Sequence, residues 1–153
     1  MKRLGALAAA LLCLGFAADD DARRLPEGTG KDAVVKVCIS CHGAANFRKA
    51  RLSREDWEEK VADMVDRGAE GTDEQLAAVV TYLTQNFGRN SRIWVNTAPL
   101  GELRAVLGLT VEEAGAVVQY RDERGEFKAW QDLLKVPGVG AGKIEAKKDL
   151  MAF

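Results

Sequence analysis

The sequence feature that most constrains this chain is the run Cys38-Ile39-Ser40-Cys41-His42. Two thiols separated by two residues can add to the two vinyl groups of one haem, and the imidazole that follows can ligate the iron. The 153 residues include one histidine, which excludes a second imidazole ligand from the same chain. The spacing therefore predicts one covalently attached haem c, anchored by Cys38 and Cys41 and ligated by His42.

Other uses of the cysteine pair fit the sequence less well. A thioredoxin-like redox pair needs a βαβ context, and no such alternation surrounds these residues. A structural disulfide would not require His42 beside it. A zinc site would need a fourth ligand, and the remaining cysteine, Cys13, lies in the amino-terminal apolar run.

The first 18 residues have the pattern of an export signal. The basic start Met1-Lys2-Arg3 precedes an uncharged run from Leu4 to Ala18, and Gly15-Phe16-Ala17 offers small residues to a signal peptidase. The run is short for a membrane-spanning helix, which needs about 20 residues, although an uncleaved membrane anchor is the alternative. We expect residues 1–18 to be removed, leaving a periplasmic or otherwise extracytoplasmic product without a transmembrane segment.

A second iron ligand is predicted from the methionines. Met64 follows the cysteine motif closely, whereas Met151 lies near the far end of the chain. Trp57, Val61 and Met64 share one helical face, so Met64 is either an axial ligand or part of the core. We predict Met64 as the axial ligand, with Trp57 and Tyr82 lining the haem pocket. An open or water-bound iron, as in a haem sensor, is the alternative.

Periodicity and capping predict an all-α chain. Boxes of the form Ser/Thr-x-x-acid or Gln begin at Ser53, Thr72 and Thr110. We expect residues 1–18, 22–88, 89–92 and 93–153 to form the signal, a haem domain, a linker and a second domain. The expected helices span residues 32–41, 53–67, 72–88, 100–107, 110–124, 130–135 and 141–150.

Residues 28–88 resemble a small class I monohaem cytochrome c. The resemblance rests on Cys38-x-x-Cys41-His42, on Trp57-x-x-x-Val61-x-x-Met64-x-x-x-Gly68 and on Tyr82-Leu83. It implies one-electron transfer by cycling of the iron, Met64 as axial ligand, and an oxidoreductase or a respiratory-chain component as redox partner.

The carboxy-terminal part contains an internal repeat. The segment Leu103-x-x-Val106-Leu107-Gly108-Leu109 matches Leu133-Leu134-x-Val136-Pro137-Gly138-Val139. Each predicts a short helix, a glycine turn and a second helix. Gly138 and Gly140 allow a tight turn that buries Val139 and leaves backbone N–H groups exposed to a phosphate oxygen.

Residues 93–153 resemble the paired helix-hairpin-helix domain of bacterial competence DNA receptors. The resemblance implies double-stranded DNA binding without sequence preference, through Gly138, Gly140, Lys143, Lys147 and Lys148. The residues that carry it are Val95-Asn96-Thr97-Ala98, Glu102-Leu103, Tyr120-Arg121, Gly125-x-Phe127-Lys128, Asp132-Leu133-Leu134 and Val136-Pro137-Gly138-Val139-Gly140.

Charge limits how strongly this domain can hold DNA. The whole chain has a formal net charge of −1, and residues 89–153 contain ten basic and nine acidic residues. Because non-specific binding depends on neutralising phosphates, we expect weak binding. The first turn also has Thr110 where the second has Gly140. A structural or protein-docking role is the alternative.

The sequence thus predicts an exported monohaem electron carrier with a helix-hairpin-helix module that docks to a partner or binds DNA. No residue suggests a substrate-transforming catalyst, so we expect a carrier and not an enzyme. The alternative is a periplasmic DNA-binding protein in which the haem is mainly structural or sensory.

Overall fold

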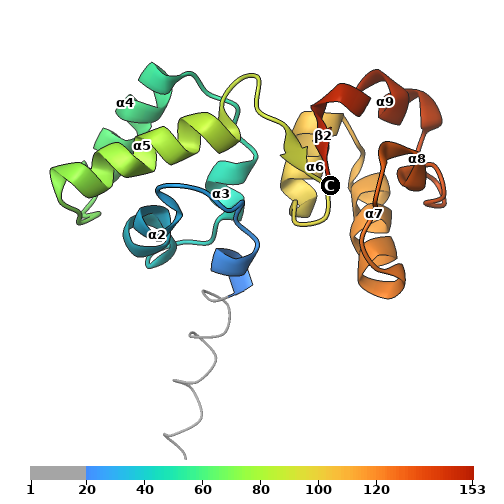
Figure 1. The fold of residues 1–153 in the computed structure, drawn as a ribbon, viewed down its shortest axis with the longest axis horizontal. Helices are drawn as coiled ribbons and strands as arrows, with labels where there is room; N and C mark the ends of the chain where they lie inside the picture. Colours follow the sequence, from blue (N-terminus) through green and yellow to red (C-terminus); the bar gives the residue numbers. More distant parts are fainter. Residues whose placement is uncertain (1–19) are drawn as a thin grey trace, which may run out of the picture.

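The computed structural model describes residues 20–153, and the predicted export signal lies outside them. The described chain forms two helical units side by side, each around its own hydrophobic core (Figure 1). The first core draws on residues between Leu25 and Phe87, and the second on residues between Ile93 and Met151. None of the described helices is long and apolar enough to span a bilayer.

The first unit is built from helices whose starts are fixed by local hydrogen bonds. The capping boxes predicted at Ser53 and Thr72 are both formed, with Asp56 and Gln75 as their third helical residues. A side-chain acceptor at a helix start satisfies N–H groups that the helix itself leaves unpaired. The elements are α2 (Lys31–Val34), the π-helical turn η1 (Val35–Ile39), α3 (Ala45–Arg48), α4 (Arg54–Asp66) and α5 (Asp73–Phe87).

The second unit contains two helical hairpins closed by a small sheet. Its first strand pairs in parallel with the last strand, with Ile93 opposite Met151 and Trp94 opposite Ala152. The elements are β1 (Ile93–Trp94), α6 (Leu100–Leu107), α7 (Val111–Arg124), α8 (Trp130–Leu133), α9 (Ala141–Ala146), the 3-10 turn η2 (Lys148–Leu150) and β2 (Met151–Ala152).

Three details of the predicted helices are corrected. The chain is mostly helical but not all-α, because β1 and β2 form a sheet. The last predicted helix, 141–150, ends at Ala146, since Met151 has to become extended to pair with Ile93 and enter the core. The first predicted helix, 32–41, is instead one α-helical turn followed by η1.

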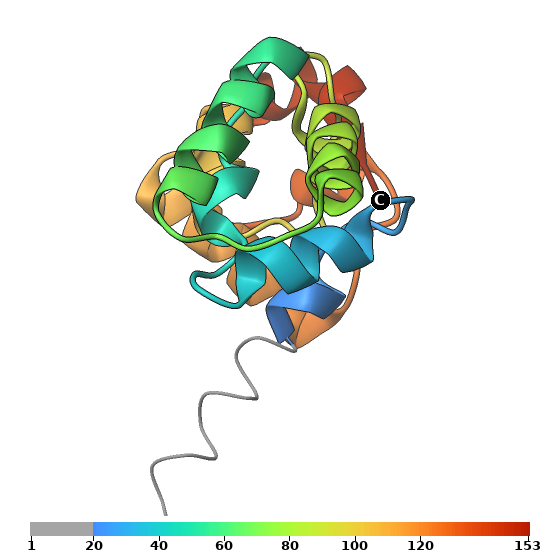
Figure 2. The same cartoon turned by 90° about the vertical axis from the view of Figure 1, so that its left-hand side faces the viewer.

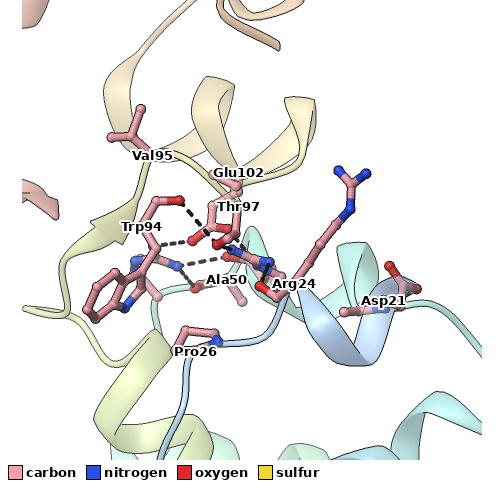
Figure 3. Close-up of polar contacts among 12 residues, drawn as sticks. Asp21, Arg24, Pro26, Ala50, Trp94, Val95, Thr97 and Glu102 are labelled. Carbon is pink, nitrogen blue, oxygen red and sulfur yellow. Dashed lines mark hydrogen bonds and ion pairs between the residues drawn. The ribbon is translucent and has the colours of Figure 1, made fainter. Parts of the chain in front are cut away.

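A buried ion cluster joins the two units. Arg48 of α3 donates from Nε to the Glu102 carboxylate of α6 over 2.8 Å, and both side chains are 1% exposed. Arg51 donates to the other Glu102 oxygen over 2.8 Å. The remaining Arg48 nitrogens donate to the carbonyl oxygen of Arg24 at 2.6 Å and the Thr97 hydroxyl at 3.2 Å. Figure 3 shows this junction, with Glu102 and Thr97 facing the backbone around Arg24.

Candidate functional site

The first unit encloses an apolar pocket of about 570 Å³ next to the cysteine motif. In Figure 2, α4, α5 and the α2–η1 segment stand on three sides of this region. Small-molecule and cofactor pockets typically span about 300–1,000 Å³ and are mainly apolar. The pocket is lined by the candidate ligands together with aliphatic and aromatic side chains, including Val37, Phe47, Leu76, Val79 and Leu83.

Cys38, Cys41 and His42 lie together on one wall of the pocket. Cys38 lies in the π-helical turn Val35–Ile39. Such turns are rare in proteins overall but are often found at functional sites. Both thiols are free in the structure, Cys38 half-buried and Cys41 exposed. Burial raises the pKa of the Cys38 thiol to about 11, with a further contribution from the nearby Cys41, so Cys38 is protonated at neutral pH. The His42 ring packs edge-on against Phe47 at 6.4 Å.

The other predicted pocket residues divide into two groups. Met64 and Trp57 both line the pocket from α4, a different wall from the cysteines. Trp57 also donates its indole N–H to the Phe87 carbonyl at 3.2 Å, which fixes α4 against the end of α5. Tyr82 is not among the residues that line this pocket. Its hydroxyl donates instead to the Pro26 carbonyl at 2.6 Å, and burial raises its pKa.

The donor set of this pocket fits a haem of the c type. Two thiols two residues apart can bond to the vinyl groups, and His42 and Met64 offer a nitrogen and a thioether sulfur from different walls. The apolar lining suits a porphyrin face. The chemistry of these residues is therefore compatible with the predicted cofactor.

The second unit repeats one hairpin with an offset of 30 residues. Gly108 and Gly138 occupy equivalent turns and both have positive φ angles, +70° and +83°, which favour glycine. Leu103 and Leu133 are equivalent and fully buried. Val139 is only partly buried, though it packs against the core as expected. The repeat predicted from the sequence is thus a structural repeat.

Several motif residues of this unit hold the fold together. Arg121 is buried and donates from Nη1 to the Val95 and Ala98 carbonyls at 2.7 and 2.8 Å, and burial lowers its pKa. Asn96 exchanges two hydrogen bonds of 2.9 Å with the Phe127 backbone. These contacts attach the segment before α6 to α7 and to the turn that follows it.

The predicted DNA contacts lie on and after the second hairpin. Lys143, Lys147 and Lys148 are all exposed, and Lys148 lies 5.9 Å from the centre of the Trp130 ring. The left-handed backbone conformation at position 138 favours glycine, whereas position 140, with a φ angle of −72°, does not need to be glycine. Lys143 and the Gly140 N–H both contact the same carboxylate, that of Glu113.

The similarity to known families lies in this second unit. A model of the helix-hairpin-helix motif family matches residues 88–151, in agreement with the two hairpins and their glycine turns. Residues 88–151 form a helix-hairpin-helix domain. The sequence of the domain includes both repeats and the residues of the small sheet up to Met151.

The helix-hairpin-helix domain is similar to parts of several curated proteins. ComE operon protein 1 of Bacillus subtilis is 36% identical over 61 residues, 40% of this chain and 30% of that protein. An uncharacterized Haemophilus influenzae protein is 32% identical over 65 residues, 42% of this chain and 58% of that protein. Mouse endonuclease/exonuclease/phosphatase family domain-containing protein 1 is 34% identical over 64 residues, 42% of this chain and 11% of that protein. The chain thus spans less than two thirds of each relative, and no solved structure matches it significantly.

These findings correct the leading description of the chain. The motifs of the first unit favour the terms cytochrome, haem and electron transfer, and the comparisons support none of them. Within residues 20–153, no group of three or more His, Cys, Asp and Glu side chains is placed to hold a metal ion. The description as an electron-transfer cytochrome is therefore wrong, and the helix-hairpin-helix domain takes its place. The family match begins at residue 88, after the residues that line the pocket, so it gives no information on whether the pocket binds a cofactor.

The buried junction has no signal in the sequence. Glu102 belongs to a motif of the second unit, and no pattern singles out Arg48 or Arg51. Their pairing joins residues 54 and 51 positions apart, beyond the reach of any local pattern.

Proposed function

We propose that this protein binds double-stranded DNA without sequence preference, through its helix-hairpin-helix domain. The observation that carries the proposal is the family match over residues 88–151, together with two hairpins whose glycine turns are both present. Backbone N–H groups and lysines contact phosphates, which position DNA without reading its sequence. Lys147 and Lys148 are exposed beside the second hairpin and would supply part of this contact.

The proposed setting is outside the cytoplasm. The supporting observations are the export pattern of residues 1–18 and the similarity to ComE operon protein 1, together with the resemblance to competence DNA receptors. The proposed action is binding, not catalysis. The matched part of the mouse relative is 11% of that protein, so its name gives no activity to this chain.

A salt series with a labelled duplex tests DNA binding. Each phosphate contact releases counterions, so the logarithm of the affinity should fall linearly with the logarithm of the salt concentration. Each contact should add about 0.9 to the magnitude of the slope of this plot. We expect Lys147→Glu with Lys148→Glu to weaken binding at least about tenfold and to lower this slope by about two. The measurement is fluorescence anisotropy of the full-length exported protein.

The matched control places the same charge change on the first unit, as Lys36→Glu with Lys49→Glu, since both lysines are exposed. This control variant should bind nearly as the wild type does. Equal weakening by both variants would mean that binding reflects net charge alone, and absence of binding at low salt would overturn the proposal.

We also propose that the pocket of the first unit holds one haem, attached through Cys38 and Cys41 and ligated by His42 and Met64. The supporting observation is the placement of all four residues on the walls of one apolar cavity. Such a haem supplies apolar volume to a small core and an iron centre that can respond to its surroundings. Its proposed role is structural or sensory.

Intact mass and the visible spectrum of the exported protein test this attachment. We expect the mature chain to be heavier by one haem, and Cys38→Ala with Cys41→Ala to lose the added mass. Ser40→Ala, between the cysteines, is the matched control and should keep it. Met64→Ala should change the spectrum if its sulfur is a ligand. A colourless product with free or mutually bridged thiols would end the cofactor proposal.

A further inference from the structure

Glu113 links the two hairpins of the helix-hairpin-helix domain. Its carboxylate accepts the Thr110 N–H of the first hairpin at 2.8 Å and the Gly140 N–H of the second at 3.3 Å. It also accepts from the Lys143 ammonium at 2.6 Å. The Glu113 side chain is only 12% exposed in this position, whereas Lys143 is 42% exposed.

The internal repeat makes this contact unusual. Glu113 and Lys143 are separated by 30 residues, the offset of the repeat, so they occupy equivalent positions in the two hairpins. Thr110 and Gly140 are equivalent in the same way. One hairpin thus carries a cation where the other carries an anion, and the two side chains meet between the hairpins.

The groups around Glu113 are those that a phosphate would require. A backbone N–H of the second turn and a lysine ammonium both donate to one anionic group, and charge-assisted bonds of this kind are the strong ones. The Lys143 contact and the backbone N–H groups hold the pKa of Glu113 below its ordinary value, so it remains an anion at neutral pH.

We propose that Glu113 is an internal competitor for DNA phosphate, which holds the Gly140 N–H and Lys143 and so sets the affinity of the domain. This inference rests on the proposed DNA binding. A phosphate can reach these two donors only by displacing the carboxylate, which costs the domain one phosphate contact. The competition adds to the near-neutral charge of residues 89–153 in keeping DNA binding weak.

Two substitutions of Glu113 separate competition from other effects. Glu113→Gln keeps an oxygen acceptor for the Thr110 N–H but removes the charge that holds Lys143. Glu113→Asp keeps the charge and the cap, because Asp56 already forms the same capping box in α4, but shortens the reach toward Lys143. We expect Glu113→Gln to tighten duplex binding about tenfold and to raise the salt slope by about one, and Glu113→Asp to tighten it by a smaller factor.

Glu112→Gln is the matched control. Glu112 is the preceding residue of the same helical turn and is exposed, so its substitution makes the same change in net charge. It should tighten binding less than about twofold. Circular dichroism of each variant verifies that α7 remains folded.

Lys143→Gln, made in the wild type and in Glu113→Gln, completes the test. We expect it to weaken binding little in the wild type, where Lys143 is already paired, and to reverse most of the gain in the Glu113→Gln protein. If Glu113→Gln binds no more tightly than Glu112→Gln, or if Lys143→Gln has the same effect in both backgrounds, the competition is overturned while DNA binding stands. If neither the wild type nor any variant binds the duplex at low salt, the proposed function itself fails and the inference falls with it.

Discussion

Among single residues, several carboxylates of this protein accept hydrogen bonds from backbone N–H groups. Asp21 accepts from the Ala44 N–H at 2.9 Å, and Asp56 accepts from the Ser53 N–H at 3.0 Å. Asp132 accepts from both Lys128 and Ala129 at the start of α8. Because such bonds favour the ionised form, they lower the pKa of Asp56 and of Asp132, whose local contacts therefore depend on pH.

Asp132 gives the clearest prediction of this kind. The Lys135 ammonium, at 2.7 Å, and the two backbone N–H groups lower the pKa of Asp132 to about 2. Since this value lies below the unfolded value of about 3.9, the stabilisation by Asp132 is present above about pH 4 and is lost as the pH falls toward 2. We expect Asp132→Asn to be less stable than the wild type at neutral pH and to lose less stability over this interval. Thermal unfolding between pH 2 and 6 measures both effects.

The control for this prediction is Asp149→Asn, an exposed aspartate in the turn after α9. Its acid profile should follow the wild type. A profile of Asp132→Asn that runs parallel to that of the wild type would show that Asp132 does not contribute through its charge.

The two hairpins show how one backbone arrangement can carry different chemistry at the scale of elements. Gly108 and Gly138 both take the left-handed conformation, and α6–α7 and α8–α9 both bury a leucine at equivalent positions. The third residue of the second helix nevertheless differs between the hairpins: it is Glu113 in α7 and Lys143 in α9. Fold and the proposed phosphate contact are therefore separable, because the turn depends on glycine and the proposed contact depends on side-chain charge.

Helices α4 and α5 play a comparable double role in the first unit. Their apolar faces form the core through Trp57, Val79 and Leu83, and the same three side chains line the pocket. A ligand in the pocket would therefore be part of the core that holds α4 against α5.

In the whole molecule, a buried charge cluster joins the two units. Removing one member of a buried ion pair leaves an uncompensated charge and typically costs about 3–5 kcal/mol. Burial lowers the pKa of Arg48, and Glu102 opposes this shift, so the arginine stays charged. Because Arg51 still pairs with Glu102 in an Arg48→Met variant, we expect a smaller loss, about 1.5–3 kcal/mol of the free energy of unfolding, in urea titrations followed by tryptophan fluorescence.

Arg54→Met is the matched control for Arg48→Met. Arg54 pairs with Glu58 at 2.9 Å, nearly the distance of the Arg48–Glu102 pair, but its side chain is 55% exposed. Such surface pairs contribute about 0–1 kcal/mol, so this variant should be close to the wild type. Equal losses in the two variants would indicate that Arg48 does not stabilise the junction through its buried charge.

Features that depend on neighbouring residues could be predicted from the amino-acid sequence. The capping boxes at Ser53, Thr72 and Thr110 form as predicted, and the glycine turn at Gly138 repeats at Gly108. Helix starts and turns are readable because their hydrogen bonds join residues three or four positions apart. The helix-hairpin-helix domain, which consists of such local units, is also the part that comparison with known families supports.

Contacts between distant residues could not be predicted in this way, because they depend on tertiary packing. Tyr82 turns away from the pocket to Pro26, 56 positions away, and Glu102 reaches Arg48 across 54. The chain leaves the helix predicted over residues 141–150 early, so that Met151 pairs with Ile93, and Glu113 meets Lys143 between the hairpins. These contacts follow from which surfaces pack together, and that choice depends on the burial of whole elements and not on any local pattern.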